Sequence, residues 1–167
     1  MRFSARSLYR SRQFFRSLRA SINDDEGDEV ARLLSPQESA LFFAMTARDQ
    51  RHSLDVLHRL HGQGQTDPEL LSAALLHDVG KGRIRLWHRV AYVLIRAACP
   101  RLLRRPASGR SSWRGALMAI ANHAERGASL VQAADSSDEV VRLVRYHESL
   151  DGGDARQALL RAADEKC

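Results

Sequence analysis

Cysteine and long apolar runs are what this 167-residue sequence has least of. Two cysteines, Cys99 and Cys167, are too few for a disulfide framework and favour a reducing, cytoplasmic location. The most apolar stretch, residues 86–103, contains several arginines and a proline, so it falls short of the roughly eighteen apolar residues that a membrane span needs. We therefore expect no transmembrane segment, and residues 86–103 should form a buried or half-buried helix.

Several common catalytic and structural patterns are also missing. The sequence has no cysteine pair with zinc-finger spacing, no G-x-S-x-G elbow and no phosphate-binding P-loop. No segment alternates polar and apolar residues with the period of two that marks a half-buried strand. Hydrophobic residues make up 44% of the chain and charged residues 28%, which is ordinary for a globular domain. We therefore expect one all-α domain of about seven or eight helices.

Acidic residues are missing from two long segments. Residues 1–22 hold six arginines and no acid, and residues 79–123 hold Lys81, nine arginines and no acid. The first segment has apolar residues at helical spacing, so it should be a basic, amphipathic helical arm. Such an arm either packs on the domain or makes weak contact with an anionic surface of lipid or nucleic acid, which would make the protein membrane-peripheral. Residues 23–29 (NDDEGDE) are expected to be an acidic linker. The predicted organisation is arm and linker over 1–29, then a helical domain over 30–167.

Helix start signals recur along the predicted domain. Three of them combine a capping side chain with an acidic or proline residue in the first turn, and the fourth is a capping aspartate alone. In chain order the expected starts are residues 35–38 (SPQE), 66–69 (TDPE), 136–139 (SSDE) and Asp154. Further helices are expected around His52 and over residues 86–103, 113–121 and 125–134.

The most specific chemical pattern is LLHDVGK, residues 75–81. His77 and Asp78 follow an apolar helix and precede a turn at Gly80, so an imidazole and a carboxylate project from neighbouring positions at a helix end. They can share one cation if other helices add ligands, and this donor set suits Mn, Fe, Zn or Ni. His58 and His61 lie off the face of His52 and are expected on the solvent side.

The pattern resembles the HD-domain metal-dependent phosphohydrolases. Members carry a histidine, a His-Asp pair, often one or two more histidines, and a distal aspartate, all on separate helices. The matching positions here are His52, His77, Asp78, His123, His147 and Asp164, with Lys81 at the family's frequent lysine. The resemblance covers about residues 45–165 and implies an HD-domain helical bundle.

The resemblance also implies a function. One or two divalent ions would activate a water molecule, which would attack phosphorus in a small phosphorylated substrate, such as a nucleotide or dinucleotide. The implied metals are Mn or Fe, and Mg, Ni and Zn are further candidates. The implied ligands of the first ion are His52, His77, Asp78 and Asp164. Those of the second are Asp78, His123 and His147. Asp78 and Lys81 are the implied catalytic residues. The implied phosphate contacts are Lys81, Arg83, Arg85 and Arg89.

Three alternatives stay open. In a one-metal member, His123 and His147 would not be ligands. A chain that keeps the pocket without hydrolysing would be a nucleotide-binding regulatory module. A chain that acts through its basic arm would be an adaptor on membrane or nucleic acid. Within the family, Tyr146 stands where the HD-GYP branch has a second histidine, and the Gly-Tyr-Pro sequence is missing, which counts against cyclic di-GMP as substrate.

Overall fold

Seven α-helices and one short 3-10 turn make up the part of the chain that the computed structural model describes, residues 22–82, 122–149 and 154–167. In chain order the elements are α2 (Asp24–Leu33), α3 (Pro36–Ala44), α4 (Ala47–Gly62), α5 (Pro68–Leu76), η1 (Val79–Lys81), α8 (His123–Ala133), α9 (Asp138–Tyr146) and α10 (Ala155–Asp164). These ranges contain no strand, which confirms the predicted all-α class. The expected helices over 86–103 and 113–121, and residues 1–21 of the expected arm, lie outside the described residues.

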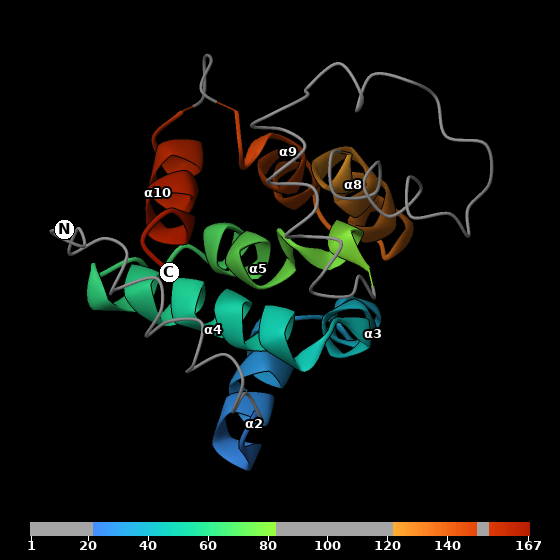
Figure 1. Cartoon of the computed structure of the whole chain (residues 1–167), viewed down its shortest axis with the longest axis vertical. Coiled ribbons are helices and arrows are strands. Elements are labelled where there is room, and N and C mark those ends of the chain that lie inside the picture. Colours follow the sequence, from blue (N-terminus) through green and yellow to red (C-terminus); the bar gives the residue numbers. More distant parts are fainter. Residues whose placement is uncertain (1–21, 83–121, 150–153) are drawn as a thin grey trace, which may run out of the picture.

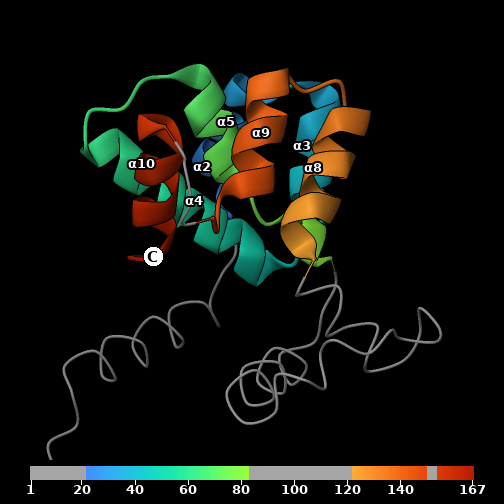
Figure 2. The same ribbon diagram turned by 90° about the horizontal axis from the view of Figure 1, so that it is seen from above.

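Helix α5 lies at the centre of the bundle (Figure 1). Its residues 70–76 are all buried, because they are apolar or small on every side of the helix. Helices α4, α9 and α10 pack against it, and α2 and α3 also contact it. Figure 2 shows α8 and α9 on one side of this central helix and α10 and α4 on the other. The end of α5 therefore lies between two helix pairs, α8 with α9 and α4 with α10. None of the described helices is long and apolar enough to cross a membrane.

Capping side chains begin the helices largely where the sequence predicts them. The residues that cap α3, α9 and α10 are Ser35, Ser137 and Asp154. Helix α5 begins within residues 66–69 as predicted, and the residue that caps it is Asp67, not Thr66, the first residue of the capping-box pattern. The Asp67 carboxylate accepts hydrogen bonds from the backbone N–H groups of Glu69 and Leu70, the second and third residues of the helix. Since Pro68 occupies the first helical position, the residue just before it is the one placed to cap.

The acidic segment 23–29 begins a helix and is not the linker that the sequence analysis expected. Asn23 and Glu26 form a reciprocal capping box. The acidic residues that follow Asn23 stand in the first turn of α2, where the helix dipole favours negative charge. Val30 anchors α2 in the hydrophobic core. The polarity of this segment therefore marks an exposed helix face, and α2 is part of the folded bundle. That residues before α2 form a separate arm stays a prediction.

One ion pair and two histidine–carboxylate contacts connect α2 to α4. Arg51 of α4 pairs with Glu26, and His58 and His61 both contact Glu29, at 2.9 Å and 3.5 Å. The two histidine side chains are exposed, which confirms their predicted position on the solvent side. The face of α4 that carries His52 is thereby left to the other helices of the bundle.

Candidate metal centre

Helices α5 and α9 each end immediately before a histidine. His77 and His147 are the C-cap residues, with nearly the same right-handed helical backbone angles. Nδ1 of His77 lies 2.9 Å from the carbonyl oxygen of Ala74, and Nδ1 of His147 lies 2.7 Å from that of Val144. The last carbonyls of a helix have no partner within the helix, so each ring caps its own helix. Because a carbonyl only accepts, Nδ1 carries a proton and Nε2 is the atom left to face the site.

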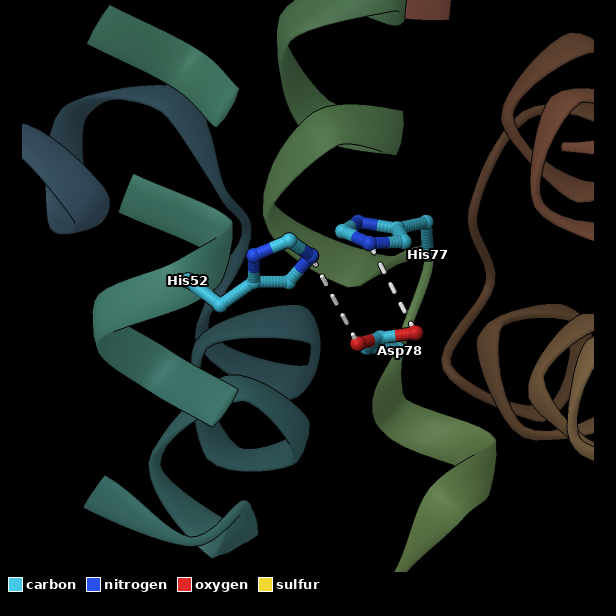
Figure 3. A group of neighbouring side chains, drawn as sticks. All are labelled: His52, His77 and Asp78. Carbon is cyan, nitrogen blue, oxygen red and sulfur yellow. Dashed lines mark ion pairs between the residues drawn. The ribbon is translucent and has the colours of Figure 1, made fainter. Parts of the chain in front are cut away.

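Asp78 lies between histidines that come from both helix pairs, α4 with α10 and α8 with α9, and from the end of α5. Its Oδ1 is 3.5 Å from Nε2 of His77 and 3.7 Å from Nε2 of His123. Its Oδ2 is 3.9 Å from Nε2 of His52 and accepts a hydrogen bond from the Lys81 ammonium. Figure 3 shows His52, from α4, and His77, at the end of α5, both turned toward this carboxylate. One carboxylate thus faces imidazoles on two sides.

The donor atoms form two groups that share this carboxylate. The groups are His52, His77 and Asp78, and then Asp78, His123 and His147. Within each group the donor atoms all lie within 4.8 Å of one another. Asp164, at the end of α10, places Oδ1 2.8 Å from Nε2 of His52 and 3.6 Å from Nε2 of His77, beside the first group. In the second group the two Nε2 atoms are 3.1 Å apart. The structure therefore brings all six candidate ligands from the sequence analysis together.

Four of these donors are buried, and two of their atoms lack a hydrogen-bond partner among the described residues. His77, Asp78, His123 and His147 are at most 2% exposed. Within the described part of the chain, the buried Nε2 of His77 and Oδ1 of Asp78 have no hydrogen-bond partner. Leaving a buried polar atom unsatisfied costs about 1–3 kcal/mol, and a bound cation would offset this cost. Imidazole nitrogen with carboxylate oxygen is a donor set that first-row transition metals accept, so the residues present fit a divalent ion.

Charges within the cluster shift its acid–base behaviour. Burial alone lowers the pKa of His77, but Asp78 and Asp164 outweigh burial and raise that pKa to about 9. Burial alone raises the pKa of Asp78, but the nearby Lys81 and His77 hold it well below its usual range. Burial, followed by the charge of His77, lowers the pKa of His147 to about 3. At neutral pH the carboxylate is therefore ionised and His147 neutral, while His77 carries a proton that a metal ion would displace.

Gly80 makes the approach between η1 and α8 possible. A Cβ atom at this position would lie 1.9 Å from the carbonyl oxygen of His123 and 2.5 Å from the backbone nitrogen of Gly127. The backbone of the His-Asp turn therefore rests directly on the first turn of α8, and this contact holds His123 beside Asp78. From the sequence, Gly80 is predicted only as the site of a turn. The sequence analysis also missed the carbonyl partners of His77 and His147, which any residue type could supply.

Of the four residues predicted to contact phosphate, the structure describes one. Lys81 ends η1, is 23% exposed at its side chain and reaches Asp78. The implied phosphate contacts Arg83, Arg85 and Arg89 lie outside the described residues.

A family profile described as HD domain matches residues 49–165. No match was found among curated proteins or among solved structures. The matched range includes every residue of the two donor groups and Asp164. Because the profile covers well over half of the sequence, the chain belongs to the HD domain family.

Proposed function

We propose that this protein is a metal-dependent phosphohydrolase that acts on a small phosphorylated substrate, with a nucleotide or dinucleotide as the expected class. One observation carries the proposal: the Asp78 carboxylate is shared by two groups of imidazole donors. Membership of the HD domain family supports the same chemistry, because that family is generally one of metal-dependent hydrolases. Mn and Fe are the expected metals.

Each residue of the cluster has a definite task in this proposal. A bound divalent ion would polarise a phosphoryl oxygen and lower the pKa of a water molecule toward neutrality. The residues that would hold a first ion are His52, His77, Asp78 and Asp164. Those that would hold a second are Asp78, His123 and His147. The carbonyl bonds at the two helix ends fix the rings of His77 and His147. Lys81 keeps a positive charge beside Asp78, where a phosphate oxygen can be stabilised.

Metal content tests the first part of the proposal. The full-length chain, exchanged into Mn²⁺ or Fe²⁺ and then desalted, should retain about two ions per chain. Asp78→Asn keeps the shape of the side chain but removes its charge, so both ions should be lost. Asp55→Asn is the matched control, because Asp55 is an aspartate of α4 whose side chain is 45% exposed and pairs with Arg51, and it should retain both. Equal retention by the Asp78 variant and the control would contradict the assignment.

Turnover tests the second part. The metal-loaded protein should hydrolyse p-nitrophenyl phosphate, bis(p-nitrophenyl) phosphate or members of a nucleotide panel, with activity that follows metal content across the variants. Metal retained in full with no turnover of any of these compounds, in either Mn²⁺ or Fe²⁺, would refute hydrolysis. Tight nucleotide binding in that case would favour the regulatory-module interpretation.

A further inference from the structure

Arg126 lies beside the turn that carries Lys81. It stands three residues after His123 on α8, and residues at this spacing share one side of a helix. A Cβ atom built on Gly82 would lie 3.5 Å from both terminal nitrogens of the Arg126 guanidinium. Gly82 directly follows Lys81, whose ammonium reaches Asp78. Two cations from different elements therefore border the same turn next to the donor groups.

Among the described residues Arg126 has no acidic partner, unlike most of the arginines in those ranges. The described arginines that pair with a carboxylate include Arg51, Arg142, Arg145, Arg156 and Arg161. Among the described residues, no carboxylate lies within 4.0 Å of Arg126 and its side chain makes no hydrogen bond. Arg32 also lacks a carboxylate partner within the described part of the chain, but it stands in the last turn of α2, where the helix dipole favours a cation.

The position of Arg126 is unfavourable for a cation that binds nothing. It lies in the first half of α8, toward the end of the helix dipole that disfavours positive charge. The acid just before it, Glu125, is engaged with Arg145. Arg126 is exposed, and none of the described residues accepts a hydrogen bond from its side chain. A planar guanidinium binds two phosphate oxygens at once, and an ammonium adds a point charge.

We propose that Arg126 binds a phosphate group of the substrate beside Lys81, and that the two cations favour a phosphate with two negative charges over a singly charged diester. This inference rests on the proposed phosphohydrolase function. It assigns the substrate class as a phosphomonoester, or a nucleotide with a terminal phosphate. Arg126 contacts the phosphate and takes no part in holding the metal.

Binding of inorganic phosphate tests the proposal without any need for turnover. Isothermal titration of the full chain, both metal-free and Mn²⁺-loaded, compares the wild type with Arg126→Gln, Arg126→Lys and the control Arg32→Gln. Loss of a charged hydrogen-bond partner corresponds to about a tenfold weaker phosphate affinity, so Arg126→Gln should show this loss. The phosphate affinity of Arg126→Lys should fall between those of the wild type and Arg126→Gln, because lysine keeps the positive charge but cannot bind two phosphate oxygens at once. The metal content of each Arg126 variant should match that of the wild type. The phosphate affinity of Arg32→Gln should also match that of the wild type.

The outcomes separate this proposal from the one on which it rests. Phosphate affinity equal to the wild type in Arg126→Gln, in both forms, overturns the inference, and so does a wild type that binds no phosphate in either form. If the protein turns over no substrate but Arg126→Gln still binds phosphate more weakly than the wild type, hydrolysis is overturned and the phosphate site stands. Where turnover is present, Arg126→Gln should raise KM for p-nitrophenyl phosphate with kcat nearly unchanged. An equal rise of KM for bis(p-nitrophenyl) phosphate would overturn the preference for a doubly charged group.

Discussion

Replacing Gly80 by alanine should separate the two donor groups. The added Cβ would lie 1.9 Å from the carbonyl oxygen of His123, about 1.5 Å short of the 3.4 Å at which ordinary van der Waals contact begins. The neighbouring atoms are backbone, so no side chain can rotate away to relieve the overlap. Either η1 or the first turn of α8 has to move by about that distance, which would widen the 3.7 Å between Nε2 of His123 and Oδ1 of Asp78.

The expected cost follows from the size of this overlap. Overpacking a buried contact costs about 1–3 kcal/mol, and a backbone clash belongs at the upper end, so Gly80→Ala should lower the free energy of unfolding by about 3 kcal/mol. For a chain of this size that corresponds to a fall in Tm of roughly 6–12 °C. The first donor group does not include His123. The variant should therefore keep one metal ion per chain and lose the other.

Urea denaturation and metal analysis of the purified variants check both expectations. Alanine substitutions at two other glycines, where the added Cβ has more room, serve as comparisons. At Gly127 the added Cβ would meet Val144 Cγ1 at 3.1 Å, and at Gly62 it would meet nothing within 4 Å. Gly127→Ala should therefore cost no more than about 1 kcal/mol and retain both ions, and Gly62→Ala should be neutral or stabilising by up to about 1 kcal/mol. The reasoning is refuted if Gly80→Ala matches Gly62→Ala in stability and metal content.

Three further variants test other parts of the structure. Ser35→Ala removes the hydroxyl that accepts the Glu38 backbone N–H in the capping box of α3 and should lower the unfolding free energy by about 1 kcal/mol, measured by urea denaturation; no change would mean that α3 begins without this cap. His123→Gln should reduce retained metal from two ions to one, by mass spectrometry of the desalted protein, and loss of both would show that the groups are not separable. Hydrogen bonds from Arg142, and then from Arg156, outweigh burial and lower the pKa of Glu139 to about 2 from 4.5. Because this pKa is lowered on folding, Glu139 stabilises the fold above about pH 4.5, and the stability is lost as pH falls toward 2. Glu139→Gln should flatten that loss in unfolding experiments between pH 5 and 2, and an unchanged slope would contradict the assignment.

Helix starts were the part of the fold that local sequence could predict. A cap is a short-range interaction between a side chain and backbone groups two or three residues away, so Ser35, Ser137 and Asp154 stand where the sequence analysis expected them. The acidic segment at 23–29 was misinterpreted because its polar residues are common to linkers and to exposed helix faces. The contact that decides between the two is the burial of Val30, which depends on the rest of the bundle.

The candidate site divides in the same way. The residue types and their spacing were enough to nominate the histidines and aspartates that the structure brings together. The bonds that orient His77 and His147 were out of reach, because their partners are backbone carbonyls with no sequence identity of their own. The contact between Gly80 and the first turn of α8 joins segments more than forty residues apart in the sequence, and Arg126 could be selected only once its neighbours were known.

The candidate metal centre is unevenly shielded from solvent. The side chains of His77, Asp78, His123 and His147 are at most 3% exposed, whereas those of His52 and Asp164 are 25% and 26% exposed. Exchange kinetics should reflect this asymmetry. A chelator that attacks from the side of His52 and Asp164 meets the first donor group directly, whereas donors of the second group lie behind Asp78. Removal of metal should therefore be biphasic, with one ion leaving rapidly and the other at the slower rate at which the helix ends open.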